Sequence, residues 1–161
     1  MTRPRRRTRA VAAVLAALLV ALGGIGCGGG SDRLSKSDYE AKVKSIGTEL
    51  KSNFGSFDPS KGSGSLETQI GQAQTRLNAA SNELRTLKPP KDAEADNAKL
   101  ADGLSGLARQ FNSLKQAVAS GNLAQVQKIA NQVKTSPSTA AANQAAADLQ
   151  KKGYKIGDLG T

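Results

Sequence analysis

The only thiol of the chain, on Cys27, is its most reactive side chain. The 161 residues include no histidine, so the commonest general base and the commonest metal ligand of proteins are both missing. One cysteine can form neither an internal disulfide nor a cysteine-based zinc site. The chemistry left to Cys27 is that of a lone thiol, which stays free, bridges to another molecule or is covalently modified.

No other arrangement of side chains supports nucleophilic catalysis. Without histidine a serine nucleophile would need a lysine base, and the Ser-x-x-Lys spacing of penicillin-recognising serine enzymes is absent from the sequence. Lys134-Thr135-Ser136 nearly matches a companion motif of those enzymes, but it has no meaning without the first. We therefore expect no catalytic residues and no enzyme activity.

Two further patterns fall short of ligand sites. Residues 92–96 have the alternating acids that open a calcium loop, but Asn97 occupies the glycine position and Gly103 the position of the bidentate glutamate. Acids there instead complement the dipole of a helix that begins nearby. The glycine-rich segments 28–30 and 62–64 lack the Lys-Ser/Thr ending and the preceding strand of a phosphate loop. The sequence thus predicts no metal site and no cofactor.

Residues 1–26 have the parts of an export signal. Five arginines among the first nine residues form a cationic head, and residues 10–22 follow as thirteen uninterrupted apolar residues. Because a membrane-spanning helix needs about 20 apolar residues, this run is typical of the core of a signal peptide. An uncleaved N-terminal membrane anchor is the alternative.

The residues that end this segment, Gly24-Ile25-Gly26-Cys27, resemble the lipobox of bacterial lipoprotein precursors. The resemblance implies that Cys27 receives a diacylglyceryl group and that the signal is cut between Gly26 and Cys27. The match departs at Gly24, where the family prefers leucine. Two or three acyl chains, palmitate among them, would anchor the protein stably to the extracytoplasmic face of the cell membrane, at about 0.8 kcal/mol per buried methylene. Ordinary cleavage, which leaves a free or cross-linking thiol, is the alternative.

Residues 27–33 read as the lipidated cysteine and a flexible Gly/Ser tether, and residues 34–161 as a helical bundle. In the bundle, apolar residues recur at steps of three and four, the spacing of one helix face. The first helix is expected to open at Ser37, where Ser37-Asp38-Tyr39-Glu40 matches a capping box. The stripes expected for the first three helices are Tyr39, Val43, Ile46 and Leu50; Leu66, Ile70, Ala73, Leu77, Ala80, Leu84 and Leu87; and Leu100, Leu104, Leu107, Phe111, Leu114 and Val118.

The second and third of these helices are joined by the Pro-Pro segment 88–91, which predicts an antiparallel hairpin. The third has the widest apolar face, so we expect it at the centre of the bundle. After the turn at 120–122 a shorter helix carries Leu123, Val126, Ala130 and Val133. Pro137 then either kinks it or begins a fifth helix, and Gly153 ends the helical part so that Tyr154 and Ile156 fold back on the bundle. The fold class is all-α, an antiparallel bundle of four to five helices.

The charged and aromatic residues indicate which kinds of partner the protein could bind. From Cys27 onward 18 basic residues face 13 acidic ones, a net +5, and they are scattered without a stripe of stacking aromatics. This argues against nucleic acid and indicates an ordinary solvated helix surface, with weak contact with anionic headgroups, acidic wall polymers or another envelope protein as the alternative. Phe54 and Phe57, in a Gly/Ser/Pro-rich loop, are either a contact patch for such a partner or a cap on the open end of the bundle.

The chain as a whole resembles the small alanine-rich helical lipoproteins of high-GC Gram-positive bacteria, which implies a location and an anchor but no reaction. We expect a lipid-anchored extracytoplasmic bundle that acts by binding at the cell envelope. The alternative is a small-ligand carrier with a pocket between the helices. The two differ in the core: a contact module has a filled core, whereas a carrier has a cavity of about 300 Å³ or more.

Overall fold

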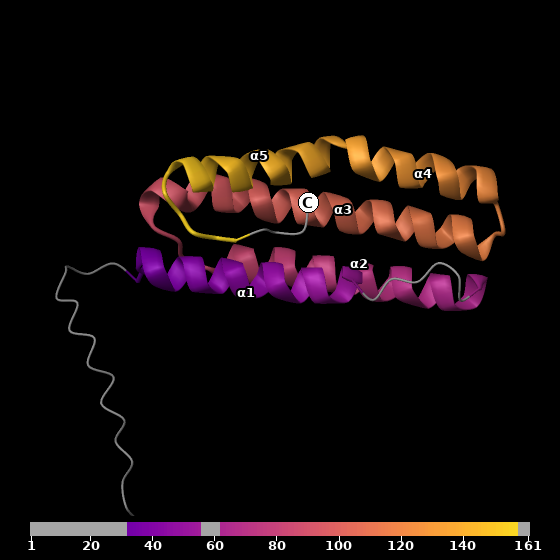
Figure 1. Cartoon of the computed structure of the whole chain (residues 1–161), viewed down its shortest axis with the longest axis horizontal. Coiled ribbons are helices and arrows are strands. Elements are labelled where there is room, and N and C mark those ends of the chain that lie inside the picture. Colours follow the sequence, from indigo (N-terminus) through magenta and orange to yellow (C-terminus); the bar gives the residue numbers. More distant parts are fainter. Residues whose placement is uncertain (1–31, 56–61, 158–161) are drawn as a thin grey trace, which may run out of the picture. The chain divides into compact units, whose positions relative to one another are not determined.

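The computed structural model of the chain describes residues 32–55 and 62–157, and within these ranges all regular structure is helical (Figure 1). The predicted all-α class is therefore confirmed. Gly26, Cys27, Phe57 and the predicted signal peptide lie outside the described residues. The helices are α1 (Lys36–Gly55), α2 (Ser63–Thr86), the short 3₁₀ helix η2 (Lys91–Ala93), α3 (Glu94–Ala119), α4 (Leu123–Thr135) and α5 (Pro137–Lys151).

Helices α1, α2, α3 and α5 share one apolar core, which lies entirely within residues 31–161. A unit that holds its own core and crosses to the rest of the chain at a single point has what an independently folding domain needs. Residues 31–161 are therefore expected to fold by themselves.

α2 and α3 form the predicted antiparallel hairpin. Ser81 Oγ on α2 donates to Ala101 O on α3 at 2.8 Å, and Asn97 Nδ2 on α3 donates to Leu84 O at 2.8 Å. Residue numbers thus fall along one helix as they rise along the other. Both side chains are buried, and each satisfies its polar group on the neighbouring helix. The hairpin is held by hydrogen bonds as well as by its two leucine-rich stripes.

α3 occupies the centre of the bundle, as its wide apolar face predicts, and packs against α2, α4 and α5. Two glycines allow α5 to approach closely. A Cβ atom at Gly103 would lie 2.8 Å from Ala142 Cβ and 2.9 Å from Ser138 O, and one at Gly106 would overlap Ser138 Oγ. These glycines lower the helix propensity of α3, but only they leave room for the backbone of α5.

The segment after residue 122 forms two helices, because Ser136 and Pro137 separate α4 from α5. Ser136 Oγ accepts a hydrogen bond from Thr139 N at 3.1 Å, and Pro137 occupies the first helical position, where its missing N–H leaves no gap. Within the described part of the chain, no helix combines the length and apolarity needed to cross a membrane.

Two local predictions were wrong. α1 begins at Lys36, and its cap is Ser35 instead of Ser37: Ser35 Oγ accepts from Asp38 N at 3.2 Å and donates to Asp38 Oδ2 at 2.6 Å. Two overlapping Ser-x-x-acid frames fit the capping pattern, and the earlier one adds backbone hydrogen bonds to the helix.

The second error concerns α4. Leu123, expected in its apolar stripe, is 80% exposed, whereas Ile129, which the expected stripe omits, is 6% exposed. At 100° per residue the two side chains lie about 120° apart around the helix. Because Ile129 is buried, Leu123 turns to solvent.

The end of the helical part follows the prediction for Gly153. Gly153 has φ +79°, its N–H donates to Gln150 O at 2.8 Å, and Tyr154 N donates to Leu149 O at 3.0 Å, which is a Schellman motif. The turn sends Tyr154 and Ile156 back onto the bundle, where they are 3% and 1% exposed. Figure 1 shows this segment running between α5 and α1.

Candidate functional site

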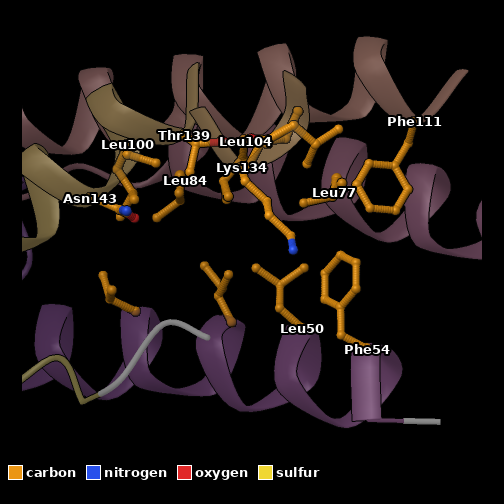
Figure 2. Close-up of a pocket in the computed structure, with 15 residues that line it drawn as sticks. Leu50, Phe54, Leu77, Leu84, Leu100, Leu104, Phe111, Lys134, Thr139 and Asn143 are labelled. Atoms are coloured by element: carbon orange, nitrogen blue, oxygen red, sulfur yellow. Dashed lines mark hydrogen bonds between the residues drawn. The ribbon is translucent and has the colours of Figure 1, made fainter. Parts of the chain in front are cut away.

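The bundle contains an apolar cavity of about 370 Å³ that is partly open to solvent. Figure 2 shows α1 on one side of it and the other helices on the opposite side, with Leu50 and Phe54 of α1 projecting toward Leu77, Leu104 and Phe111. Its lining residues are Val43, Ile46, Leu50, Phe54, Leu77, Leu84, Leu100, Leu104, Leu107, Phe111, Val133, Lys134, Thr139, Ala142 and Asn143.

The walls are the apolar stripes that the sequence predicts. Val43 and Leu84 are fully buried, and Leu77 and Leu100 are 2% and 3% exposed, so these side chains form the base of the cavity. Protein interiors are normally packed so closely that few voids exceed the size of a water molecule. An apolar space of this size, which reaches solvent at the exposed Lys134 and Asn143, therefore needs an explanation.

Small side chains on α5 are one reason that the space stays unfilled. α5 presents Thr139, Ala142 and Asn143 to the cavity, and none of these reaches as far as the leucines of the other walls. A second reason is the placement of α1, which packs along α2 and makes no comparable contact with α4 or α5. The cavity thus lies along the seam between α1 and the α4–α5 pair.

Aromatic pairs lie toward the two ends of α1. Phe54 meets Phe111 edge to face, with ring centroids 5.6 Å apart, and both line the cavity. Near the other end of the helix Tyr39 meets Tyr154 in the same manner, also at 5.6 Å. Phe54 is half-buried in this pair. Phe54 lies at one end of the cavity. Its role as a partner contact stays a prediction.

The polar lining residues all come from the α4–α5 side. Thr139 Oγ1 is occupied, because it donates to Val133 O at 2.5 Å and lies 3.0 Å from Ser136 Oγ. Lys134 and Asn143 are exposed to solvent at the seam. Lys134 has no ion pair or hydrogen bond within the described ranges, and its side chain in Figure 2 extends toward the α1 side of the cavity. It is the single ionisable group of the lining.

A hydrogen-bond network fixes the tyrosine end of the bundle. Tyr39 Oη donates to Asn97 Oδ1 at 3.2 Å, and Tyr154 Oη donates to Asp92 Oδ1 at 2.7 Å. Lys152 Nζ donates to Asp96 Oδ2 at 2.6 Å. These bonds link the C-terminal segment to η2 and α3, and they link α1 to α3, so the network serves as a clamp, named here the tyrosine clamp.

The ionisation of the tyrosine clamp matches a structural role. Burial raises the pKa of Tyr39 above its ordinary value, with smaller contributions from Tyr154 and Asp96. Burial, followed by the hydrogen bond to Asp92, raises the pKa of Tyr154 to about 12. Both hydroxyls therefore stay protonated at neutral pH, where a general base must instead lose its proton easily. The network holds the fold together, and neither hydroxyl suits a general base.

The acidic motif at 92–96 takes part in the tyrosine clamp. Asp92 and Asp96, which resemble the start of a calcium loop, instead bind Tyr154 and Lys152. Among the described residues, no three cysteine, aspartate or glutamate side chains gather in a group that could hold a metal ion. The acids thus serve the tyrosine clamp, in addition to the helix-dipole role predicted for them.

Sequence reasoning missed the α4–α5 wall of the cavity, above all Lys134. The available signal was the run of small residues at 138–147, which cannot fill the space opposite a helix rich in large side chains. No family model, curated protein or solved structure matches this chain.

Proposed function

We propose that this protein is an extracytoplasmic carrier that binds a small apolar ligand between its helices. The observation that supports the proposal is the cavity of about 370 Å³, which exceeds the size expected of a carrier and lies within the usual range of small-molecule sites. Its walls are almost wholly aliphatic and aromatic, so the ligand that fits them is apolar over most of its surface.

The energetics of the apolar walls support the same proposal. The cavity is partly open to solvent, so water reaches its apolar lining when no ligand is bound. A ligand that covers this lining gains about 25 cal/mol for each Å² of apolar surface removed from water. A ligand that binds only the folded domain stabilises it by RT ln(1 + [L]/Kd), so the domain becomes more stable as the ligand concentration rises above Kd.

The proposed anchor suits such a carrier. The lipobox-like sequence before Cys27 and the glycine run after it support a domain held close to the membrane surface by a short tether. Apolar molecules partition into membranes, so a carrier tethered there lies where its ligand is concentrated. Function as a protein contact module has less support, because Leu123 is the one large apolar side chain that is strongly exposed in the described ranges.

Binding of the neutral dye N-phenyl-1-naphthylamine to residues 31–161 tests the proposal. The dye should bind and raise the melting temperature of the wild-type unit. Val43→Phe, which adds a ring to the cavity wall, should abolish binding while the protein keeps its helical circular-dichroism spectrum. The matched control Val126→Phe changes a half-buried residue outside the cavity and should leave binding intact. Equal dye binding by all three proteins would contradict the proposal.

A further inference from the structure

The cavity is long and narrow. Its lining residues on α1 extend from Val43 to Phe54, which at 1.5 Å per residue is about 16 Å along the helix. The lining residues of α3 extend over a similar stretch, from Leu100 to Phe111. A volume of about 370 Å³ over such a length has room for one extended chain and not for a multi-chain lipid.

The only charged side chain in the cavity lining, within the described part of the chain, is positive. Lys134 is a cation without an ion-pair partner in the described ranges, and no acidic side chain lines the cavity. Its four-carbon stem belongs to the wall, and its nitrogen extends across the seam toward α1 (Figure 2). An ammonium group at the edge of an apolar site is stabilised by a ligand that brings a negative charge to the same place.

We propose that the ligand is a single-chain anionic amphiphile, such as a fatty-acid carboxylate, whose chain lies in the cavity and whose head group binds Lys134. This inference rests on the proposed carrier function and specifies its ligand. The chain follows the apolar walls between α1 and α3. The head group emerges at the seam between α1 and α4, where Lys134 neutralises it in contact with water.

The test compares two probes of equal chain length on residues 31–161 by isothermal titration calorimetry. Dodecanoate carries the negative charge, and dodecan-1-ol has the same chain without it. An ion pair on an exposed lysine contributes up to about 1 kcal/mol, so dodecanoate should bind up to about fivefold more tightly than dodecan-1-ol. Lys134→Met should remove this preference and leave the affinity for dodecan-1-ol unchanged, whereas Lys134→Arg should keep the preference.

Lys128→Met is the matched control. Lys128 lies on the same helix, is exposed and does not line the cavity, so its loss should leave the preference for dodecanoate as it is. Equal binding of both probes by the wild-type unit would overturn the proposal of an anionic ligand. A preference for dodecanoate that survives Lys134→Met would overturn it as well. Neither result would contradict the carrier function. If neither probe nor the neutral dye binds, the carrier function itself fails.

Discussion

Phe54 on α1 and Phe111 on α3 meet with their ring centroids 5.6 Å apart and their planes at 68°, across one end of the apolar cavity. The pair links α1 directly to α3, as does the hydrogen bond from Tyr39 Oη to Asn97 Oδ1 near the other end of α1. Phe54, which the sequence predicts to be either a partner contact or a cap on the bundle, thus packs against the core.

The Phe54–Phe111 pair should be energetically coupled. Aromatic pairs of this geometry contribute about 0.5–1.5 kcal/mol beyond the area they bury. In a double-mutant cycle of Phe54→Ala and Phe111→Ala, urea unfolding should give a coupling free energy of about 1 kcal/mol. Additive losses, with no coupling, would show that the two rings do not meet in solution.

The tyrosine clamp should make stability depend on pH in the alkaline range. The pKa of Tyr154 is about 12 in the folded protein against 10.0 for the free side chain, so folding favours the protonated hydroxyl. Its contribution is complete below pH 10 and is lost as the pH rises from 10 toward 12. The free energy of unfolding of Tyr154→Phe should therefore fall less over this interval than that of the wild type. Parallel curves for the two proteins would rule out the clamp.

Glycine-to-alanine substitutions should have opposite signs on two helices. At Gly103 an added Cβ would lie 2.8 Å from Ala142 Cβ, so Gly103→Ala should lower the free energy of unfolding by about 1–3 kcal/mol through overpacking. At Gly71 on α2 the nearest atom would be Lys115 Nζ, 3.6 Å away at the end of a flexible side chain. Gly71→Ala should raise stability by up to about 1 kcal/mol. Stabilisation by both would disprove the close approach of α5.

Cys27 gives a prediction about processing. If the lipobox resemblance holds, the protein recovered from the membranes of its host has a mature chain that starts at Cys27 and bears a diacylglyceryl group. Intact-mass measurement should show this mass, and Cys27→Ala should lose it and release the protein from the membrane. A soluble product cut near Gly26 without lipid would refute the anchor.

The helices could be predicted because side-chain periodicity is a property of one segment alone. Tyr39, Val43, Ile46 and Leu50 face the core since their spacing allows no other common face. The turn at Gly153 follows from local backbone chemistry in the same way, whereas the sequence left open whether Pro137 kinks a helix or begins a new one. These parts of the fold need no knowledge of the neighbouring helices.

The cavity could not be predicted, because it depends on distances between helices. Periodicity identifies the apolar face of α1 but not how far Val43 lies from Ala142 on α5. The absence of a side chain at Gly103 lets α5 lie close to α3, and the position of α5 affects how much space is left beside α1. The place of Lys134 in the cavity lining could not be predicted for a similar reason. On its own helix it is an ordinary exposed lysine, and only the adjoining cavity gives it a role.

The carrier function is tested most directly by native mass spectrometry of the full-length protein isolated from its own membranes, with wild type and Val43→Phe compared side by side. We expect the wild-type protein to carry one small molecule in addition to any covalent lipid, and Val43→Phe to lack it. The same bound mass on both proteins, or none on either, would contradict a ligand in the cavity.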